Sequence, residues 1–160
     1  MLRLEKVTIK NAGDLLRLNV AESQRGFCAS NSFSLAEAYT AVVENHPIFP
    51  FGVYDGDTLV GFVMIDYDYK DHFHETPQIA KGNYLLSRLM IDEKYQRKGY
   101  GRGAVELALD FIRSFPCGKA EYCWLDVEPE NEVARKLYRS FGFVELGEME
   151  GQGIVAVLKL

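Results

Sequence analysis

The sequence feature that most constrains the fold is a strand, a glycine-rich turn and an amphipathic helix that follow one another along the chain. Residues 83–92 place apolar side chains on one face of a predicted strand. Residues 104–115 repeat apolar side chains at helical spacing, and Pro116 and Gly118 follow them. The turn between the two elements, residues 96–103, reads Gln-Arg-Lys-Gly-Tyr-Gly-Arg-Gly. Such a unit predicts a mixed α/β fold with an anion site at the turn.

The remaining segments add strands and helices on both sides of this unit. Ser34 and Glu37 match a capping box, which predicts that the second helix begins at Ser34. Asp55-Gly56-Asp57 predicts a tight turn between two strands, because the Asp-Gly pair tolerates positive φ angles. Strands are predicted at 3–9, 51–54, 58–66, 122–127, 143–146 and 154–158, and helices at 11–18, 34–45 and 131–140. Residues 67–82 follow neither period and are predicted to form a long loop.

Composition limits the classes of protein that the chain can belong to. Of 160 residues, 48% are hydrophobic and 26% are charged, so one domain spanning residues 1–160 is expected. The net charge of −5 and the scattered basic residues argue against binding to duplex nucleic acid. No stretch approaches the roughly 20 apolar residues that a membrane span needs. Cysteines without a C-x-x-C pair suggest neither disulfides nor zinc, and predict a soluble, cytoplasmic protein.

The glycine-rich turn has the features of a diphosphate site. Backbone N–H groups at a helix N-terminus point outward, and the helix dipole favours negative charge there. The glycines leave the amides open to phosphate oxygens, and the basic residues add charge without a metal. The predicted cofactor-binding residues of the turn are Gln96, Arg97, Lys98, Gly99, Tyr100, Gly101, Arg102 and Gly103. The pattern matches neither a Walker loop nor a Rossmann fingerprint, and a solvated glycine connector is the simplest alternative.

Two motifs carry a resemblance to a known family. Leu89-Met90-Ile91 leading into Gln96-x-x-Gly99-x-Gly101 resembles the acetyl-CoA motif of GNAT acetyltransferases, Q/R-x-x-G-x-G/A. Downstream, the family pattern N-x-x-A-x-x-L-Y-x-x-x-G-F is matched by Asn131, Ala134, Leu137, Tyr138, Gly142 and Phe143. Because both motifs occur in the right order, the chain is identified as a member of the GNAT superfamily.

The resemblance implies an α/β (α+β) GNAT fold. Its mixed, mostly antiparallel sheet would have about six or seven strands, about four flanking helices, and diverging fourth and fifth strands. The chain would be an acetyl-CoA-dependent N-acetyltransferase whose pantetheine arm pairs with the strand through Leu89, Met90 and Ile91. An N–H group near Met90 would face the thioester oxygen, and Asn131 would contact the cofactor besides capping its helix.

The resemblance also assigns proton transfers. Tyr138 stands where similar enzymes place a tyrosine that protonates the leaving CoA thiolate, although helical spacing alone is compatible with a core aromatic. Ser87 stands where the family commonly has a glutamate base, so the base of this chain is left open. One route would pass a proton from Ser87 through water to Glu75, Asp126 or Glu128.

The predicted acceptor is a primary amine on a small cationic molecule, such as a polyamine. The segments G-D-x-L-V-G-F and I-D-E-x-Y-Q-x-K-G resemble those of bacterial diamine and polyamine acetyltransferases. Predicted substrate-binding residues are Asp66, Asp68 and Glu75, which lie among aromatic residues such as Tyr69 and Phe73. Carboxylates and ring faces both attract ammonium groups, so this stretch is expected to lie beside the reactive end of the cofactor.

Other functions and partners stay open as alternatives. A protein or peptide N-acetyltransferase is the nearest one, and a non-catalytic acyl-CoA-binding module belongs to another class. A single-stranded nucleic-acid binder is disfavoured, because a stacking platform needs several aromatic residues beside a basic groove. His72 and His74 are interpreted as polar loop residues, so no metal is expected. No membrane partner is expected, and a homodimer is compatible with the resemblance.

Overall fold

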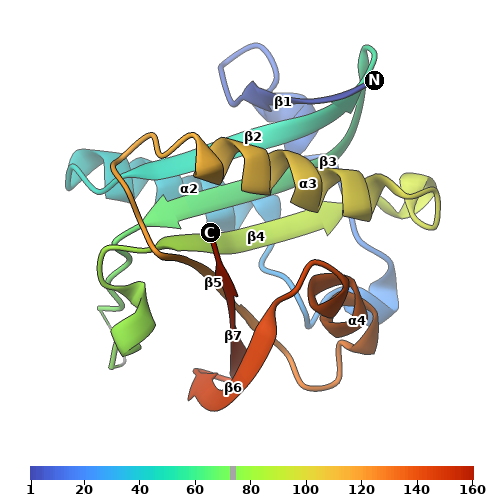
Figure 1. Cartoon of the computed structure of the whole chain (residues 1–160). Helices are drawn as coiled ribbons and strands as arrows, with labels where there is room; N and C mark the ends of the chain where they lie inside the picture. The colour runs from blue at the N-terminus through green and yellow to red at the C-terminus, as the bar shows by residue number, and fades with distance from the viewer. Residues whose placement is uncertain (73–74) are drawn as a thin grey trace.

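The computed structural model describes residues 1–72 and 75–160, which form a mixed sheet with helices on both of its faces (Figure 1). The strands are β1 (Leu2–Lys6), β2 (Ile48–Asp55), β3 (Thr58–Tyr67), β4 (Tyr84–Ile91), β5 (Tyr122–Val127), β6 (Val144–Glu150) and β7 (Gly153–Lys159). The helices are α1 (Ala12–Leu15), α2 (Asn31–Val43), α3 (Tyr100–Arg113) and α4 (Glu132–Ser140), with short 3-10 turns at Glu22–Gln24, Gln78–Ala80 and Glu93–Tyr95. The expected α/β (α+β) class is confirmed.

The sheet opens between its fourth and fifth strands. Its order is β1-β2-β3-β4-β5-β7-β6, and neighbouring strands are antiparallel except for the parallel pair β4 and β5. This pair holds together only where Tyr84 lies opposite Cys123 and Leu85 lies opposite Trp124. Beyond these residues β4 continues along β3, and β5 continues along β7. The expected divergence is confirmed, and it leaves one edge of β4 open over residues 86–91.

The two faces of the sheet bury different sets of side chains. Strand β3 sends alternate residues to opposite faces, as the period of an extended strand requires. On the face that α3 crosses in Figure 1, the core includes Val63, Ile65, Ala104, Ala108 and Ile112. On the opposite face, α1 and α2 cover a smaller core made of Leu15, Ala38, Phe62, Met64 and Met90.

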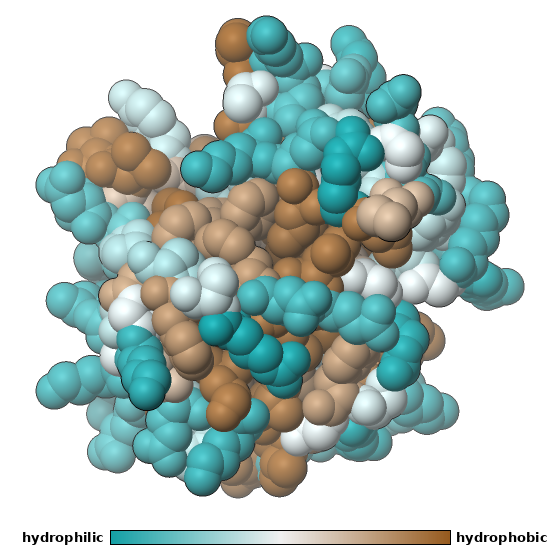
Figure 2. Space-filling model, turned by 45° about the horizontal axis from the view of Figure 1, so that its top comes forward, coloured by the Kyte–Doolittle hydropathy of each residue, from teal (hydrophilic) through white to brown (hydrophobic). Residues whose placement is uncertain are grey.

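The surface has apolar as well as polar areas. Figure 2 shows apolar residues gathered in the middle of one face, with hydrophilic residues around them. Exposed apolar side chains on α2 include Phe33, Tyr39, Val42 and Val43. Among the described residues, no helix is both long and apolar enough to cross a membrane.

Helix α2 begins earlier than the capping box predicts. Ser30 is its N-cap, and the Ser30 hydroxyl accepts a hydrogen bond from the Phe33 N–H at 3.2 Å. Ser34 lies inside the helix, where its hydroxyl donates to the Ser30 carbonyl at 3.1 Å. The assignment of Ser34 and Glu37 to a capping box is therefore wrong, because another serine four residues upstream caps the helix. The Glu37 side chain instead contacts Arg88 on β4.

Helix α3 also begins earlier, inside the glycine-rich turn. Its N-cap is Gly99, at a positive φ of 85° that favours glycine, and Tyr100 is its first residue. Gly101 and Gly103 are consequently helical rather than part of the turn. A Cβ atom at Gly103 would overlap the Leu2 side chain of β1. Gly103 thus serves the packing of α3 on the sheet, which is a different role from the predicted opening for a phosphate.

Candidate active site

The open edge of β4 offers backbone donors to the gap beside β5. The Asp92 N–H donates to the Val60 carbonyl on β3 at 3.0 Å. Because backbone groups alternate along a strand, the Met90 N–H also faces β3, whereas the N–H groups of Leu89 and Ile91 face the gap. The N–H donor that the family resemblance places near Met90, facing the thioester oxygen, would therefore belong to Leu89 or Ile91. An extended ligand can pair with these amides as an added strand would.

The glycine-rich turn presents the first amides of α3. Gly99 has no side chain to cap the helix, and the Gly103 N–H makes the first helical hydrogen bond, to the Gly99 carbonyl at 3.1 Å. Within the part of the chain that the structure describes, no group accepts a hydrogen bond from the N–H groups of residues 100–102. A helix N-terminus with free amides and no acidic cap suits a pyrophosphate.

Two side chains of the turn tie it to the rest of the fold. The Gln96 amide donates from Nε2 to the Ile91 carbonyl at 2.9 Å and to Gln24 Oε1 at 2.7 Å. The Tyr100 hydroxyl donates to Oδ2 of Asp55, the last residue of β2, at 2.9 Å. These contacts fix the glycine-rich turn at the end of β4. Both residues were predicted to bind the cofactor, and both have structural partners here.

The basic side chains of the turn divide into two kinds. Arg97 and Lys98 are exposed, and Lys98 Nζ lies 3.2 Å from the Lys94 carbonyl and 5.5 Å from the centroid of the Tyr95 ring. Arg102 instead lies over the Phe141 ring, 4.8 Å from its centroid, where it packs α3 against the end of α4. Arg97 and Lys98 are thus the better placed charges for phosphate groups.

Helix α4 carries the second sequence motif. Asn131 is its N-cap, and Asn131 Oδ1 accepts a hydrogen bond from the N–H three residues further on at 3.3 Å. The Tyr138 ring packs edge-on against Phe143, with 5.8 Å between the ring centroids. Burial raises the pKa of Tyr138 well above its usual range, and the nearby Cys28 and Asp126 raise it further. The hydroxyl is therefore protonated at neutral pH, which is the form that a general acid needs.

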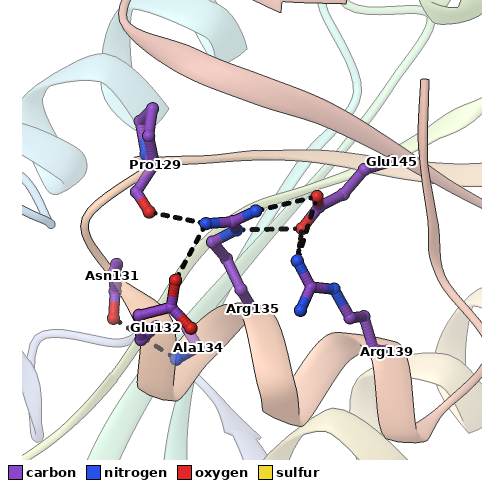
Figure 3. A network of polar contacts seen from close by, with 7 residues as sticks. All are labelled: Pro129, Asn131, Glu132, Ala134, Arg135, Arg139 and Glu145. Carbon is purple, nitrogen blue, oxygen red and sulfur yellow. Dashed lines mark hydrogen bonds and ion pairs between the residues drawn. The ribbon is translucent and has the colours of Figure 1, made fainter. Parts of the chain in front are cut away.

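A network of ion pairs fixes the position of α4 (Figure 3). Arg135 lies at its centre, with Nε and Nη2 each 3.0 Å from an oxygen of Glu145 on β6. Arg135 Nη1 donates to the Pro129 carbonyl at 2.7 Å and to Glu132 at 3.1 Å. Arg139 approaches Glu145 at 3.0 Å. The network joins α4 to the loop before it and to β6, and so sets the orientation of the helix that carries Tyr138.

Ser87 is an extra residue in β4. The register between β3 and β4 shifts here, so that Ser87, between Leu86 and Arg88, lies opposite no residue of β3. Its hydroxyl donates to Asp66 Oδ2 at 2.5 Å, and it also lies 3.1 Å from the Met64 carbonyl. The direct partner of Ser87 is thus Asp66, which the sequence predicted only as a substrate-binding residue. Sequence reasoning had considered other carboxylates, reached through water.

Arg88 lies at the centre of a group of titratable side chains on the α2 face. Arg88 Nη2 is 2.6 Å from Glu37 Oε2 on α2. Burial raises the pKa values of Cys28, Glu37 and Asp126, and the positive charge of Arg88 partly opposes this in each case. Asp126 is accessible from solvent on one side but surrounded by protein on the others. Cys28, Glu37, Arg88 and Asp126 are named the Arg88 cluster below.

The three predicted substrate-binding residues do not lie together. Asp66 is buried at the end of β3, with 3% of its surface exposed. Asp68 accepts a hydrogen bond from the Gly82 N–H at 2.7 Å and so holds the ends of the loop together. Glu75 is exposed. Phe73 and His74, which also took part in the sequence-based predictions, lie outside the described residues.

The structure was also searched for a metal site. Within residues 1–72 and 75–160, no group of three or more His, Cys, Asp or Glu side chains converges on one point. His72 Nε2 lies 3.7 Å from Glu44 Oε2 at the surface, where both side chains are exposed. This pair is compatible with the interpretation of His72 as a polar loop residue.

A cavity of about 370 Å³ lies beside the Arg88 cluster. It is lined by Arg25, Cys28, Asn31 and Met90, with apolar residues that follow α1. A larger opening of about 780 Å³ lies at the opposite ends of β4 and β5, and its lining includes Lys81, Arg113, Lys119 and Lys159. Of the two, the smaller cavity touches the open stretch of β4, at Met90, so it is the better candidate for an approach to the site.

Sequence reasoning missed the Arg88 cluster. It assigned Glu37 to a cap and gave Arg88 and Cys28 no role in the site. One usable signal was present, because Arg88 is a charged residue in an otherwise apolar strand, and buried charges are seldom left without a partner. No local pattern could show that the partner lies on α2.

Comparisons with known proteins agree with this geometry. Residues 15–143 match the acetyltransferase (GNAT) family. The chain is 29% identical over 158 residues to the spermine/spermidine N(1)-acetyltransferase of Bacillus subtilis (strain 168), covering 99% of this chain and 97% of that protein. The fold is similar to that of an aminoglycoside acetyltransferase in complex with coenzyme A, with a TM-score of 0.78, 16% identity, and coverage of 99% and 95% of the two chains. A spermidine N-acetyltransferase from Vibrio cholerae, in complex with CoA and spermine, gives a TM-score of 0.68, 23% identity, and coverage of 99% and 94%.

A sheet that opens between two parallel strands, beside a helix that begins at a glycine-rich turn, defines an acyl-CoA-dependent transferase. The chain belongs to the acetyltransferase (GNAT) family and is an acetyl-CoA-dependent N-acetyltransferase.

Proposed function

We propose that the protein transfers the acetyl group of acetyl-CoA directly to a primary amine of a small cationic acceptor, and that this acceptor is a polyamine. The observation that carries the proposal is the set of carboxylates on the α2 face of the sheet. Glu37, Asp66 and Asp126 come from three different elements and lie around the open part of β4, with Arg88 among them. The match to a spermine/spermidine acetyltransferase along nearly the whole chain supports the same class of acceptor.

The backbone supplies most of the contacts for acetyl-CoA in this proposal. The free N–H groups of residues 100–102 bind the pyrophosphate, and Arg97 and Lys98 add positive charge from the surface. The N–H groups of Leu89 and Ile91 hold the pantetheine arm and face the thioester oxygen as negative charge develops on it. Gly99 allows the chain to turn sharply between these two sets of donors.

Side chains carry the chemistry. The nitrogen lone pair of the acceptor attacks the thioester carbonyl carbon, and the bond between carbon and sulfur then breaks. Tyr138 gives its hydroxyl proton to the departing sulfur. The nitrogen, which carries an extra proton after its attack, releases that proton as the amide forms, and the proton restores the Tyr138 hydroxyl. Its raised pKa keeps that proton in place until negative charge appears next to it.

The electrostatics of the α2 face favour a cationic acceptor over a neutral one. Burial raises the pKa values of Glu37 and Asp126 because their charged forms are poorly solvated. An ammonium group bound between them would compensate for the lost solvation. A neutral amine or an amino acid would add no positive charge beyond that of Arg88, which already pairs with Glu37, so it should bind less well.

A panel of acceptors tests the proposal, with thiol release from acetyl-CoA as the readout. Spermidine and spermine should give the highest kcat/KM, and their KM should rise with ionic strength because charge attraction is screened. A peptide N-terminus that outcompetes every polyamine would make the protein a peptide N-acetyltransferase. Acetyl-CoA binding without thiol release to any amine would make it a binding module. Either result would overturn the proposal.

A further inference from the structure

Three side chains, those of His46, Asp66 and Ser87, contact one another in this order between the end of α2 and the bulge of β4, and they are called the row below. It begins at His46, whose backbone N–H donates to the Ala41 carbonyl at 2.8 Å and so closes the last turn of α2. The residue before it, Asn45, has a φ of 57°, the left-handed conformation that commonly ends a helix. The next residue, Pro47, accepts a hydrogen bond from the Tyr67 N–H at 3.2 Å. These contacts hold His46 next to the end of β3, where Asp66 is buried.

Each oxygen of the Asp66 carboxylate faces one side chain of this row. His46 Nε2 lies 3.5 Å from Asp66 Oδ1, and the Ser87 hydroxyl lies 2.5 Å from Asp66 Oδ2. His46 Nε2 is buried and has no hydrogen-bond partner within the described chain. Ser87 is partly exposed, whereas only 3% of the Asp66 surface is exposed. The row therefore connects an accessible hydroxyl to a buried carboxylate.

We propose that Asp66 takes up the proton of the acceptor ammonium through the Ser87 hydroxyl, and that His46 holds Asp66 in position for this transfer. Ser87 Oγ gains a proton from the ammonium nitrogen as its own proton passes to Asp66 Oδ2. The nitrogen keeps the electron pair of its broken N–H bond and uses it to attack the thioester carbonyl carbon. Asp66, now neutral, returns its proton to solvent through Ser87 after the product leaves.

Other carboxylates near the site are less suited to this role. Glu37 already pairs with Arg88 Nη2 at 2.6 Å, although burial raises its pKa on balance. Burial likewise raises the pKa of Asp126, against the smaller effect of the Arg88 charge. Asp66 is the carboxylate that has the Ser87 hydroxyl in direct contact, at 2.5 Å.

The groups that face Asp66 come from several elements. Glu37 lies on α2, His46 follows α2, and Tyr69 follows β3, while Ser87 lies on β4. The proposal rests on acetyl transfer to an amine, whichever amine that is, so its test is separate from the identification of the acceptor.

The first test compares variants at Ser87, using the best acceptor of the amine panel. Ser87→Ala should lower kcat by about 100-fold, with little change in the KM of either substrate, because the relay is broken while the binding groups remain. Ser87→Thr restores a hydroxyl and should recover most of the activity. Ser114→Ala, at the exposed end of α3, is the matched control and should behave as the parent does. Equal kcat values for Ser87→Ala and the parent, with chemistry rate-limiting, would overturn the proposal, as would a Thr variant as slow as the Ala variant.

The second test separates proton uptake from packing. Asp66→Asn should match the loss in Ser87→Ala, and combining it with Ser87→Glu should return part of the activity by placing a carboxylate at the position of the hydroxyl. Asp110→Asn, exposed on α3, is the control. His46→Phe should lower kcat with little change in the KM of either substrate, and His46→Gln, which keeps a polar group toward Asp66 Oδ1, should recover part of the loss. A parent-like kcat in His46→Phe would remove His46 from the row, and failure of the double variant to exceed Asp66→Asn, with both folded by thermal melting, would count against Asp66.

A parent enzyme that acetylates no amine would instead refute the proposed function. The variants at Ser87 and Asp66 give information only once turnover with some amine is established, so the two failures are distinguishable. Acetyl-CoA affinity, measured by calorimetry, should be the same in the parent and in the Ser87 variants.

Discussion

The two faces of the sheet contribute to the site in different ways. On the α3 face the interior is apolar, and the contribution comes from backbone amides at the start of α3, all within a few consecutive residues. On the α2 face the contribution comes from side chains on α2, β3, β4 and β5, which are far apart in the sequence. In the proposed function, recognition of the cofactor is thus local and made by the backbone. Recognition of the acceptor and the proton transfers would be long-range and made by side chains.

This difference predicts how each face responds to substitution. Backbone amides keep their direction whatever side chain they carry, provided that the side chain leaves space for the ligand. A group of partly buried charges has no such tolerance, because removing one member leaves the others without compensation. Variants of the α3 face should therefore change acetyl-CoA affinity alone, and variants of the α2 face should change the acceptor kinetics alone.

The largest effect on turnover is expected for Tyr138, where the backbone contribution of the α3 face and the side-chain contribution of the α2 face meet. Tyr138→Phe should lower kcat by about 100- to 1,000-fold and leave acetyl-CoA affinity nearly unchanged, because it removes a proton donor used only as the thiolate departs. Steady-state kinetics combined with calorimetry measure both quantities. A variant with normal turnover, in conditions where chemistry limits the rate, would assign Tyr138 to packing against Phe143.

A variant of the α3 face should change cofactor binding and nothing else. A Cβ atom at Gly101 would make only an ordinary contact, 3.7 Å from Leu137 Cδ2, so Gly101→Val should fold. Its branched side chain would stand in front of the free amides and should weaken acetyl-CoA binding by about tenfold or more. Calorimetry measures the affinity, and a thermal melt confirms the fold. Unchanged affinity in a folded variant would mean that the diphosphate site lies elsewhere.

A variant of the α2 face should change the acceptor and nothing else. Asp126→Asn should raise the KM for spermidine by about five- to tenfold, with acetyl-CoA affinity and the KM for a neutral amine unaffected. Because burial raises the pKa of Asp126, this carboxylate loses its charge at a higher pH than an ordinary aspartate as the solution is acidified. The parent's KM for spermidine should therefore rise toward acidic pH earlier than that of the variant. Identical pH profiles would separate Asp126 from acceptor binding.

The smallest effect is expected away from both faces, in the network of Figure 3. Hydrogen bonds from Arg135, with Arg139 nearby, lower the pKa of Glu145 from 4.5 to about 2. A lowered pKa in the folded state means that the stabilisation is present above about pH 4.5 and is lost as the pH falls toward 2. At neutral pH, Glu145→Gln should cost about 1 kcal/mol or less, because the pair is partly exposed to solvent, and should lower Tm by about 2–4 °C. Equal Tm values at pH 7 would show that the network contributes nothing to stability.

The local half of the site could be predicted from the sequence. The strand, the glycine-rich turn and the helix appear where their residue patterns place them, because their contacts are between near neighbours. The start of α3 was placed too late, since helical spacing of apolar residues cannot show that Gly101 and Gly103 already lie in the first turn. The capping box failed for a similar reason, because Ser30 offers an equally good cap upstream of Ser34.

The long-range half of the site could not be predicted in the same way. Asp66 was placed with the loop acids, but it belongs to β3 and points toward Ser87. That contact depends on the register between β3 and β4, which shifts at the bulge around Ser87. The residue types at this position do not indicate a bulge. The same holds for Glu37 and Arg88, which are 51 positions apart in the sequence and 2.6 Å apart in the fold.

The bulge in β4 has a consequence for how such enzymes can change over time. Ser87 lies opposite no residue of β3, so it belongs to no directly opposed pair of residues, although its hydroxyl contacts Asp66 and the Met64 carbonyl of that strand. A mutation at this position can therefore alter the reaction while the neighbouring pairs, and the stability that they provide, are retained. At most positions of a central strand, a substitution that improves activity also disturbs strand pairing and lowers stability. Position 87 has no directly opposed partner, so one substitution there could replace the serine by another acid-base side chain with a smaller loss of stability.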